Sequence, residues 1–313
     1  MQNHEPIYDV RTLGAAKTVI LGLQHTFAMF GATVLVPILT GLPISTTLLF
    51  AGLGTLLFHL VTKGQVPAFL GSSFAFLGGY AAVAPLLEDG SPNTEMLPYA
   101  CGGVFCAGIV YLILSALIKG FGAKKVMRFF PPVVTGPIII AIGLILAPTA
   151  INNCATNWPV AIIALVTVVI FNIWGRGMSK IVPILIGIIV SYIAAFVMGD
   201  VSFEGIGDEA ILGLPPITLM KFDISAIITI MPLALATMME HIGDISAIGA
   251  TTGKNYIEKP GLHRTLLGDG LATCLAAAFG APANTTYGEN TGVLALTKVY
   301  DPRVMRIAAV FAI

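Results

Sequence analysis

Charged side chains are scarce in this chain: Asp, Glu, Lys and Arg together make up 10% of its 313 residues. A soluble domain carries roughly 25% charged residues, so this scarcity excludes an ordinary water-soluble fold. The 16 basic and 16 acidic residues balance, and the basic residues are scattered along the chain. A nucleic-acid partner, which would need a concentrated basic surface, is therefore not expected.

Cysteine and the common catalytic motifs are equally sparse. Of the four cysteines, Cys101, Cys106 and Cys274 lie in apolar runs and Cys154 is isolated, so the sequence predicts neither a disulfide framework nor a metal site. The pair Glu240-His241 reverses the order of a zinc-protease HExxH motif, and neither a Gly-x-Ser-x-Gly elbow nor a Walker A loop is present. We expect no enzyme activity, no cofactor and no ATP-driven transport by this chain alone.

Apolar residues are abundant instead. Hydrophobic residues make up 56% of the chain and its mean hydropathy is +0.91. Apolar runs of about 17–25 residues, long enough to span a bilayer, recur throughout. We predict an all-α polytopic membrane protein with spans near residues 14–38, 43–62, 67–87, 98–120, 127–149, 158–174, 181–198, 224–249, 265–280 and 285–299. An eleventh run begins near Val304 and is still apolar at Ile313, so we expect a truncated or partial chain.

Basic residues mark one side of the predicted membrane. In the loops at one end of the spans the basic residues are Arg11, Lys17, Lys63, Lys119, Lys124, Lys125, Arg128, Arg176, Lys180, Lys254, Lys259, Arg264, Lys298, Arg303 and Arg306. The opposite loops carry Glu88, Asp89, Glu95, Asp200, Glu204, Asp208 and Glu209, with Lys221 as the exception. The positive-inside rule therefore predicts a cytoplasmic N-terminus.

Two spans are interrupted in the same way. Span three begins VPAFLGSSFAFLGGY (66–80) and span ten begins APANTTYGENTGVLAL (281–296), each with Pro, a small polar pair and an aromatic residue. Because they stand seven spans apart, they suggest an inverted repeat with a binding site at the midplane, where half-helix N-termini offer free N–H groups. The alternative is that their Gly and Ser residues only permit close helix packing.

Three carboxylates in spans eight and ten are candidate site residues. A carboxylate inside a membrane marks a functional site by default, which applies to Glu289 in span ten. Glu240 and Asp244 in span eight are four residues apart and so share one helix face. Two carboxylates in a low-dielectric setting are not both ionised comfortably, so we expect one to exchange a proton near neutral pH, as a proton-coupled carrier requires.

Two further titratable residues, His25 and Asp269, lie in other spans. His25 in span one is either a proton-coupling residue or a hydrogen-bonded packing residue, and Gln24 beside it favours a polar network. Asp269 lies a few residues into span nine from Arg264. We expect Asp269 to partner a neighbouring basic residue or a helix end.

These motifs resemble a known family. GENTGVLALTK fits the nucleobase–ascorbate transporter signature through Glu289, Asn290, Gly292, Thr297 and Lys298. The segments Gln24-His25, GSSFAF (71–76), MEHIGD (239–244) and PGLHR (260–264) are similar to those of bacterial uracil permeases. The chain is identified as a member of the nucleobase:cation symporter-2 family, and the resemblance covers essentially its whole length.

The resemblance implies fourteen spans in two inverted repeats of seven, with short strands opening spans three and ten. A core domain would comprise residues 1–121 (spans one to four) and 223–313 (spans eight to eleven, incomplete). Residues 122–199 would form the gate spans five to seven, residues 200–222 an extracytoplasmic linker, and spans twelve to fourteen would lie outside this chain.

The resemblance also implies proton-coupled uracil uptake across the bacterial cytoplasmic membrane, by an elevator-like movement of core against gate. Uracil would bind Glu240, Glu289, Gly288 and the backbone N–H of Phe74, with Tyr287 and Ala32 lining the pocket. Asp244, Glu240 or His25 would carry the proton. A homodimer in the lipid bilayer is compatible with this family.

One residue departs from the uracil pattern. Asp244 stands where the best-known uracil permease has His, and Asp there resembles the purine branch, whereas Glu289 in place of Gln favours uracil. A xanthine or urate permease is therefore the alternative within the family. An anion exchanger or channel on the same scaffold is the alternative of another class, although the site carboxylates would repel an anion.

Overall fold

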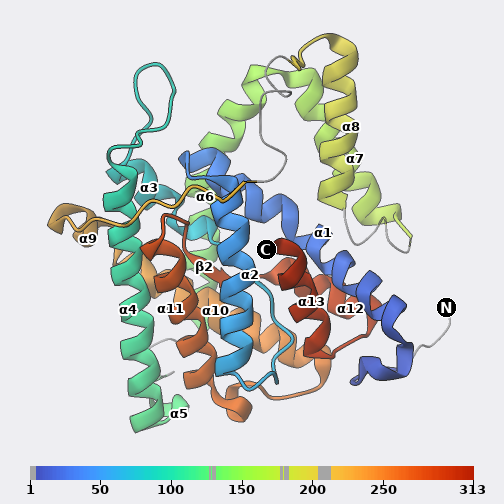
Figure 1. Cartoon of the computed structure of the whole chain (residues 1–313), viewed down its shortest axis with the longest axis vertical. Coiled ribbons are helices and arrows are strands. Elements are labelled where there is room, and N and C mark those ends of the chain that lie inside the picture. Colours follow the sequence, from blue (N-terminus) through green and yellow to red (C-terminus); the bar gives the residue numbers. More distant parts are fainter. Residues whose placement is uncertain (1–4, 127, 129–131, 177–178, 180–182, 204–212) are drawn as a thin grey trace. The chain divides into compact units, whose positions relative to one another are not determined.

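A computed structural model describes residues 5–126, 128, 132–176, 179, 183–203 and 213–313 (Figure 1). The chain forms two compact units. The larger comprises Met1–Ile142 and Pro216–Ile313, and the smaller comprises Gly143–Pro215.

The larger unit contains most of the helices. They are α1 (Ala15–Thr40), α2 (Ile44–Val61), α3 (Leu77–Val83), α4 (Leu97–Phe121), α5 (Ala123–Val126), α9 (Ile224–Ile230), α10 (Leu233–Thr252), α11 (Leu262–Ala278), α12 (Gly288–Thr297) and α13 (Pro302–Ala312). Three short helical turns accompany them, namely η1 (Val10–Leu13), η2 (Phe74–Phe76) and η6 (Ile257–Gly261). Helix α6 (Pro132–Thr156) crosses into the smaller unit, where α7 (Trp158–Trp174) packs on α8 (Pro183–Met198).

These elements confirm the predicted all-α membrane fold. Among the described residues, four helical stretches are long and apolar enough to cross a membrane: Ala15–Thr40, Ile44–Val61, Leu97–Phe121 and Ile224–Thr252. Shorter apolar helices cover Phe74–Val83, Trp158–Trp174 and Leu185–Met198. Span eight is divided between α9 and α10 at Met231–Pro232, where proline cannot continue the hydrogen-bond ladder of the preceding turn.

The predicted interruptions of spans three and ten are two short strands. Strand β1 (Leu70–Ser72) pairs antiparallel with β2 (Asn284–Thr286), in the register Leu70↔Thr286, Gly71↔Thr285 and Ser72↔Asn284. All six residues are buried. The ladder supplies hydrogen-bond partners to extended backbone that lipid could not satisfy.

Small residues allow the central helices to approach closely. Helix α11 packs against both α4 and α2, and Gly108 of α4 faces Gly270 of α11. A Cβ on Gly108 would lie 2.5 Å from Cys274 Sγ, and one on Gly270 would lie 2.6 Å from Tyr111 Cβ. This close approach is typical of helix pairs in membranes, where packing rather than the hydrophobic effect drives association.

A short N-terminal segment contacts the ends of several helices of the larger unit. Ile7 forms a parallel bridge with Val299, and the Tyr8 hydroxyl donates to the Thr252 carbonyl at 2.8 Å. Two residues further on, the Val10 N–H donates to Asp301 Oδ2 at 2.9 Å. Residues 7–10, here called the N-terminal strap, therefore join the ends of α10 and α12 to the start of α13.

Candidate functional site

The two interrupted spans meet at the β1–β2 ladder. The ladder is extended at both ends, because Ser73 N donates to Ala283 O at 2.9 Å and Tyr287 N donates to Phe69 O at 3.0 Å. Since the strands are antiparallel, their half-helices leave the ladder at opposite ends: η2 begins at Phe74 and α12 begins at Gly288. The arrangement is that of two inverted half-helices whose first N–H groups adjoin the same pair of strands.

A threonine from a neighbouring helix holds the outer edge of each strand. Thr55 of α2 accepts from Leu70 N at 2.9 Å and lies 3.2 Å from Leu70 O, to which it donates. Thr273 of α11 donates to Asn284 O at 3.0 Å. Helices α2 and α11 correspond to spans two and nine, so the equivalent span of each repeat fixes its own strand.

Tyr287 joins the β1–β2 ladder to α1 through hydrogen bonds of its hydroxyl. Its hydroxyl donates to Ser72 O at 2.8 Å, lies 3.2 Å from Ser72 Oγ and accepts from Thr33 Oγ1 at 3.3 Å. Tyr287 is 5% exposed and the nearby Ala32 is 7% exposed. The hydroxyl of this predicted pocket residue therefore holds β1 in place.

The predicted site residues gather around α10. Glu240 and Asp244 are half-buried on this helix, and both η2 and α12 contact it. A Cβ on Gly288 would lie 3.7 Å from Asp244 Oδ1, which places the start of α12 beside this carboxylate. Glu289, the next residue of α12, is exposed.

His25 contacts the signature motif. The buried Asn290 side chain lies 3.1 Å from His25 Nδ1 through its Nδ2, which also donates to His25 O at 3.1 Å. The motif's last residues end the helix: Thr297 Oγ1 accepts from Val299 N at 3.3 Å, and Lys298 has a left-handed backbone with φ 55°. Gly292 is exposed in the middle of α12.

The sequence interpretation missed a buried cluster behind Asp244. Asp269 accepts from Thr286 N at 3.1 Å, and its other oxygen lies 3.3 Å from His241 Nδ1, with both side chains fully buried. Asp269 was expected to partner a neighbouring basic residue or a helix end, but its oxygens contact strand β2 and His241. The nearby Arg264 instead donates through Nη1 to Val61 O. His241 beside Glu240 was the available signal, but its partner depends on how α11 packs.

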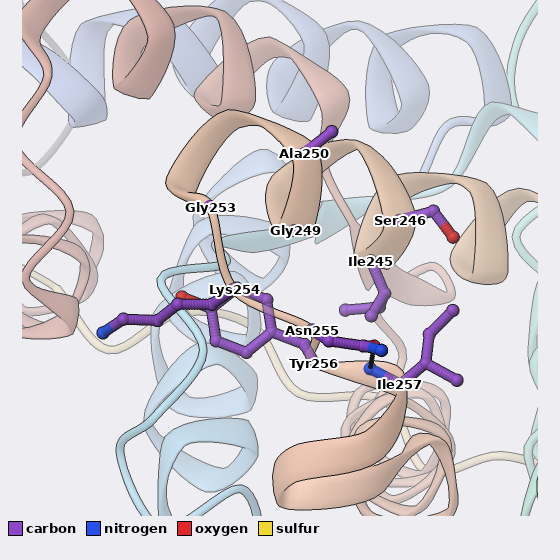
Figure 2. Close-up of a pocket in the computed structure, with 9 residues that line it drawn as sticks. All are labelled: Ile245, Ser246, Gly249, Ala250, Gly253, Lys254, Asn255, Tyr256 and Ile257. Atoms are coloured by element: carbon purple, nitrogen blue, oxygen red, sulfur yellow. Dashed lines mark hydrogen bonds between the residues drawn. The ribbon is translucent and has the colours of Figure 1, made fainter.

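A separate pocket of about 370 Å³ lies beyond the site at the end of α10 (Figure 2). It is lined by Ile245, Ser246, Gly249, Ala250, Gly253, Lys254, Asn255, Tyr256 and Ile257. None of these is a carboxylate, so the pocket lacks the acceptor chemistry of the site around Glu240. Across the described part of the chain, no group of three His, Cys, Asp or Glu side chains is arranged to hold a metal ion.

Known proteins match this chain over most of its length. The family model described as "Permease family", that of the xanthine and uracil permeases, matches residues 16–313. A probable uracil permease of Pasteurella multocida is 44% identical over 95% of this chain and 72% of the relative. A uracil permease of Bacillus caldolyticus is 42% identical over 99% of this chain and 74% of the relative.

The fold likewise has a solved counterpart. The transmembrane domain of the cyanobacterial bicarbonate transporter BicA superposes with a TM-score of 0.73 at 17% identity, over 98% of this chain and 83% of that domain. This likeness supports the predicted 7+7 inverted-repeat architecture. The family match and the permease relatives indicate a transporter, and with the apolar helices they support a multi-pass membrane protein. The chain belongs to the xanthine and uracil permease family, as the signature ending at Thr297 and Lys298 predicted.

Proposed function

We propose that this protein carries uracil into the cell together with protons. The observation that carries the proposal is the position of Gly288, at the start of α12, beside Asp244 on α10. Glu289 follows Gly288 directly, and Glu240 lies one helical turn before Asp244. Relatives at 38–44% identity that are named uracil permeases support uracil as the substrate.

In this proposal the two edges of the pyrimidine bind different residues. The Glu240 carboxylate accepts a hydrogen bond from a ring N–H. Glu289 and the Gly288 backbone take the opposite edge, while Phe74 offers its N–H at the start of η2. A carboxylate suits an imide because charge-assisted hydrogen bonds are strong. Ala32 and Tyr287 close the pocket behind the ring.

The Glu240–Asp244 pair is the proposed site of proton uptake. Four residues apart on one helix and half-buried, the two carboxylates repel each other unless one holds a proton. His25 is the second candidate for this role, through its contact with Asn290. The proposed movement is that of a core formed by 1–121 and 223–313 against a gate formed by 122–199. We place the protein in the bacterial inner membrane as a homodimer with a cytoplasmic N-terminus.

Uptake of labelled uracil tests the proposal. Cells that lack their own pyrimidine permease and express this protein should accumulate uracil, and a protonophore should abolish accumulation. Uptake that ignores the protonophore would exclude symport with protons.

Competition with unlabelled compounds distinguishes uracil from the other candidate substrates. Asp244 favours a purine as the second candidate, so unlabelled xanthine and unlabelled uracil are compared as competitors in the same cells. Competition by xanthine alone would reassign the substrate to a purine. Competition by bicarbonate or sulfate alone would reassign the protein to anion transport.

A further inference from the structure

Three buried side chains connect Asp244 to the interior of the protein. Thr286 Oγ1 lies 3.1 Å from Asp244 Oδ2 and 3.2 Å from His241 Nδ1. His241 Nδ1 lies 3.3 Å from Asp269 Oδ2, and Asp269 Oδ1 accepts the Thr286 N–H at 3.1 Å. One carboxylate thus holds the backbone of β2, while the hydroxyl of the same β2 residue reaches the α10 carboxylate.

The hydroxyl of Thr286 has one proton and two neighbours, so it can point in two directions. When Asp244 is ionised, the hydroxyl donates to it and accepts from His241 Nδ1–H. When Asp244 is protonated, its O–H donates to Thr286, whose hydroxyl then turns towards His241 Nδ1. His241 must change tautomer or rotate for this second state, because a ring nitrogen that bears a proton cannot accept.

Asp269 makes these two states differ in energy. An ionised Asp269 favours the tautomer with a proton on His241 Nδ1, since a lone pair there would face a carboxylate oxygen 3.3 Å away. The His241 and Asp269 side chains have no exposed surface, so water does not replace a lost partner. An unpaired buried polar group is costly, and that cost links the proton on Asp244 to the position of Thr286.

We propose that Thr286, His241 and Asp269 transmit the protonation of Asp244 to strand β2, and through β2 to the Gly288–Glu289 end of the uracil site. Thr286 lies two residues before Gly288, so a change in its hydrogen bonds acts directly on the start of α12. The inference rests on the proposed function and adds three positioning residues to it. These three residues are the physical link through which proton binding and uracil binding influence each other.

Other titratable groups surround Asp244 and influence whether it is protonated. They are Glu240 and His241 on α10, Asp269 on α11, Glu289 on α12 and Tyr111 on α4, whose hydroxyl donates to Thr237 of α10. Of these groups in the described part of the chain, only His241 lies within hydrogen-bonding distance of Thr286 Oγ1. The variants therefore target the hydroxyl and the buried pair behind it.

The test measures uracil affinity of the purified protein by calorimetry at about pH 5.5 and pH 8. We expect the wild-type affinity to differ by about tenfold between these values, within the usual range of coupling between two ligands. Thr286→Val removes the hydroxyl but keeps the shape, and should reduce this ratio to about twofold or less. Thr286→Ser keeps the hydroxyl and should retain the wild-type ratio.

Asp269→Asn provides an independent variant, because its amide oxygen still accepts the Thr286 N–H while the charge is lost. It should lower the ratio of the two uracil affinities as Thr286→Val does. The double variant should lower this ratio no further, since both changes break the same series of hydrogen bonds. A purely structural role predicts the opposite: equal loss of affinity at both pH values with an unchanged ratio, which would overturn the inference. Wild-type protein that binds no uracil would instead refute the proposed function before any variant is tested.

Discussion

The two interrupted spans are alike in backbone and unlike in chemistry. Each has a three-residue strand, held at its edge by a threonine of the preceding span and followed by a half-helix. The half around β1 continues through Ser72, Ser73 and Phe74 into the uncharged helix α3. The half around β2 carries Thr286, which reaches two carboxylates, and Glu289 at the start of α12.

This difference separates the roles of the repeats. In the proposed site, the symmetric backbone forms a cradle in which both halves offer helix N-termini to a polar solute. The proposed side-chain acceptors come from the β2 half and from α10. A duplicated fold therefore supplies the geometry, while substitutions in one copy supply the recognition chemistry.

Glu289→Gln should have the largest effect on binding, because it removes the carboxylate that only the β2 half possesses. Loss of a hydrogen bond to a charged group costs about 1.5–3 kcal/mol, which corresponds to roughly 10- to 150-fold weaker uracil binding. Calorimetry checks this, with Glu258→Gln in the exposed η6 turn as the same chemical change outside the site. Unchanged affinity in Glu289→Gln would remove this residue from the site.

Gly71→Ala should disrupt the β1–β2 ladder, which is the part of the backbone that both halves share. Its new Cβ would lie 2.5 Å from Tyr287 Cζ and 2.8 Å from Thr33 Oγ1, and the Tyr287 ring is held by its hydroxyl. Overpacking of this kind costs about 1–3 kcal/mol, so thermal unfolding should occur at lower temperature. Gly78→Ala in α3 meets no atom within 4 Å and is the control; equal stability of the two variants would contradict the ladder's tight packing.

Thr55→Val and Thr273→Val compare the two edge contacts directly. Thr55 makes two hydrogen bonds with Leu70, whereas Thr273 makes one with Asn284. At about 1 kcal/mol for each bond, Thr55→Val should destabilise the protein more, by about 1 kcal/mol. Chemical denaturation of both variants measures this difference, and the reverse order would show that the strands depend on other contacts.

Phe74→Leu should have the smallest effect, because the β1 half is proposed to offer a backbone N–H rather than a side chain. We expect uracil affinity to change by less than about threefold, because the replacement stays apolar and keeps the backbone N–H. Binding measured beside Glu289→Gln tests this. A loss as large as that of Glu289→Gln would mean that the Phe74 ring itself recognises the substrate.

Much of this architecture was predictable from the sequence. Apolar run length located the helices, and the repeated pattern around Ser72 and Thr285 located both interruptions, since Pro and small polar residues cannot continue a lipid-facing helix. That these interruptions are strands was implied by the family resemblance. The spacing of Glu240 and Asp244 placed both on the same side of α10. These are local properties, which a helical or extended period expresses directly.

The contacts between distant spans were not predictable in this way. Asp269 was expected to partner a neighbouring basic residue or a helix end, yet the packing of α11 on β2 brings it to His241 and Thr286. Similarly, no periodicity indicates that the Tyr287 hydroxyl reaches Ser72. Such pairs depend on crossing angles and close approach at glycines, which a single sequence does not encode in its spacing.

The N-terminal strap has a consequence for the order of synthesis. Val10 and its partner Asp301 are 291 residues apart, so the strap finds its contacts only after α13 has been synthesised. Closure of the strap therefore follows the synthesis of α10, α12 and α13. A molecule whose strap is closed has already gathered α10, α12 and α13, and protection of residues 7–10 from protease would report that this part of the protein has been assembled.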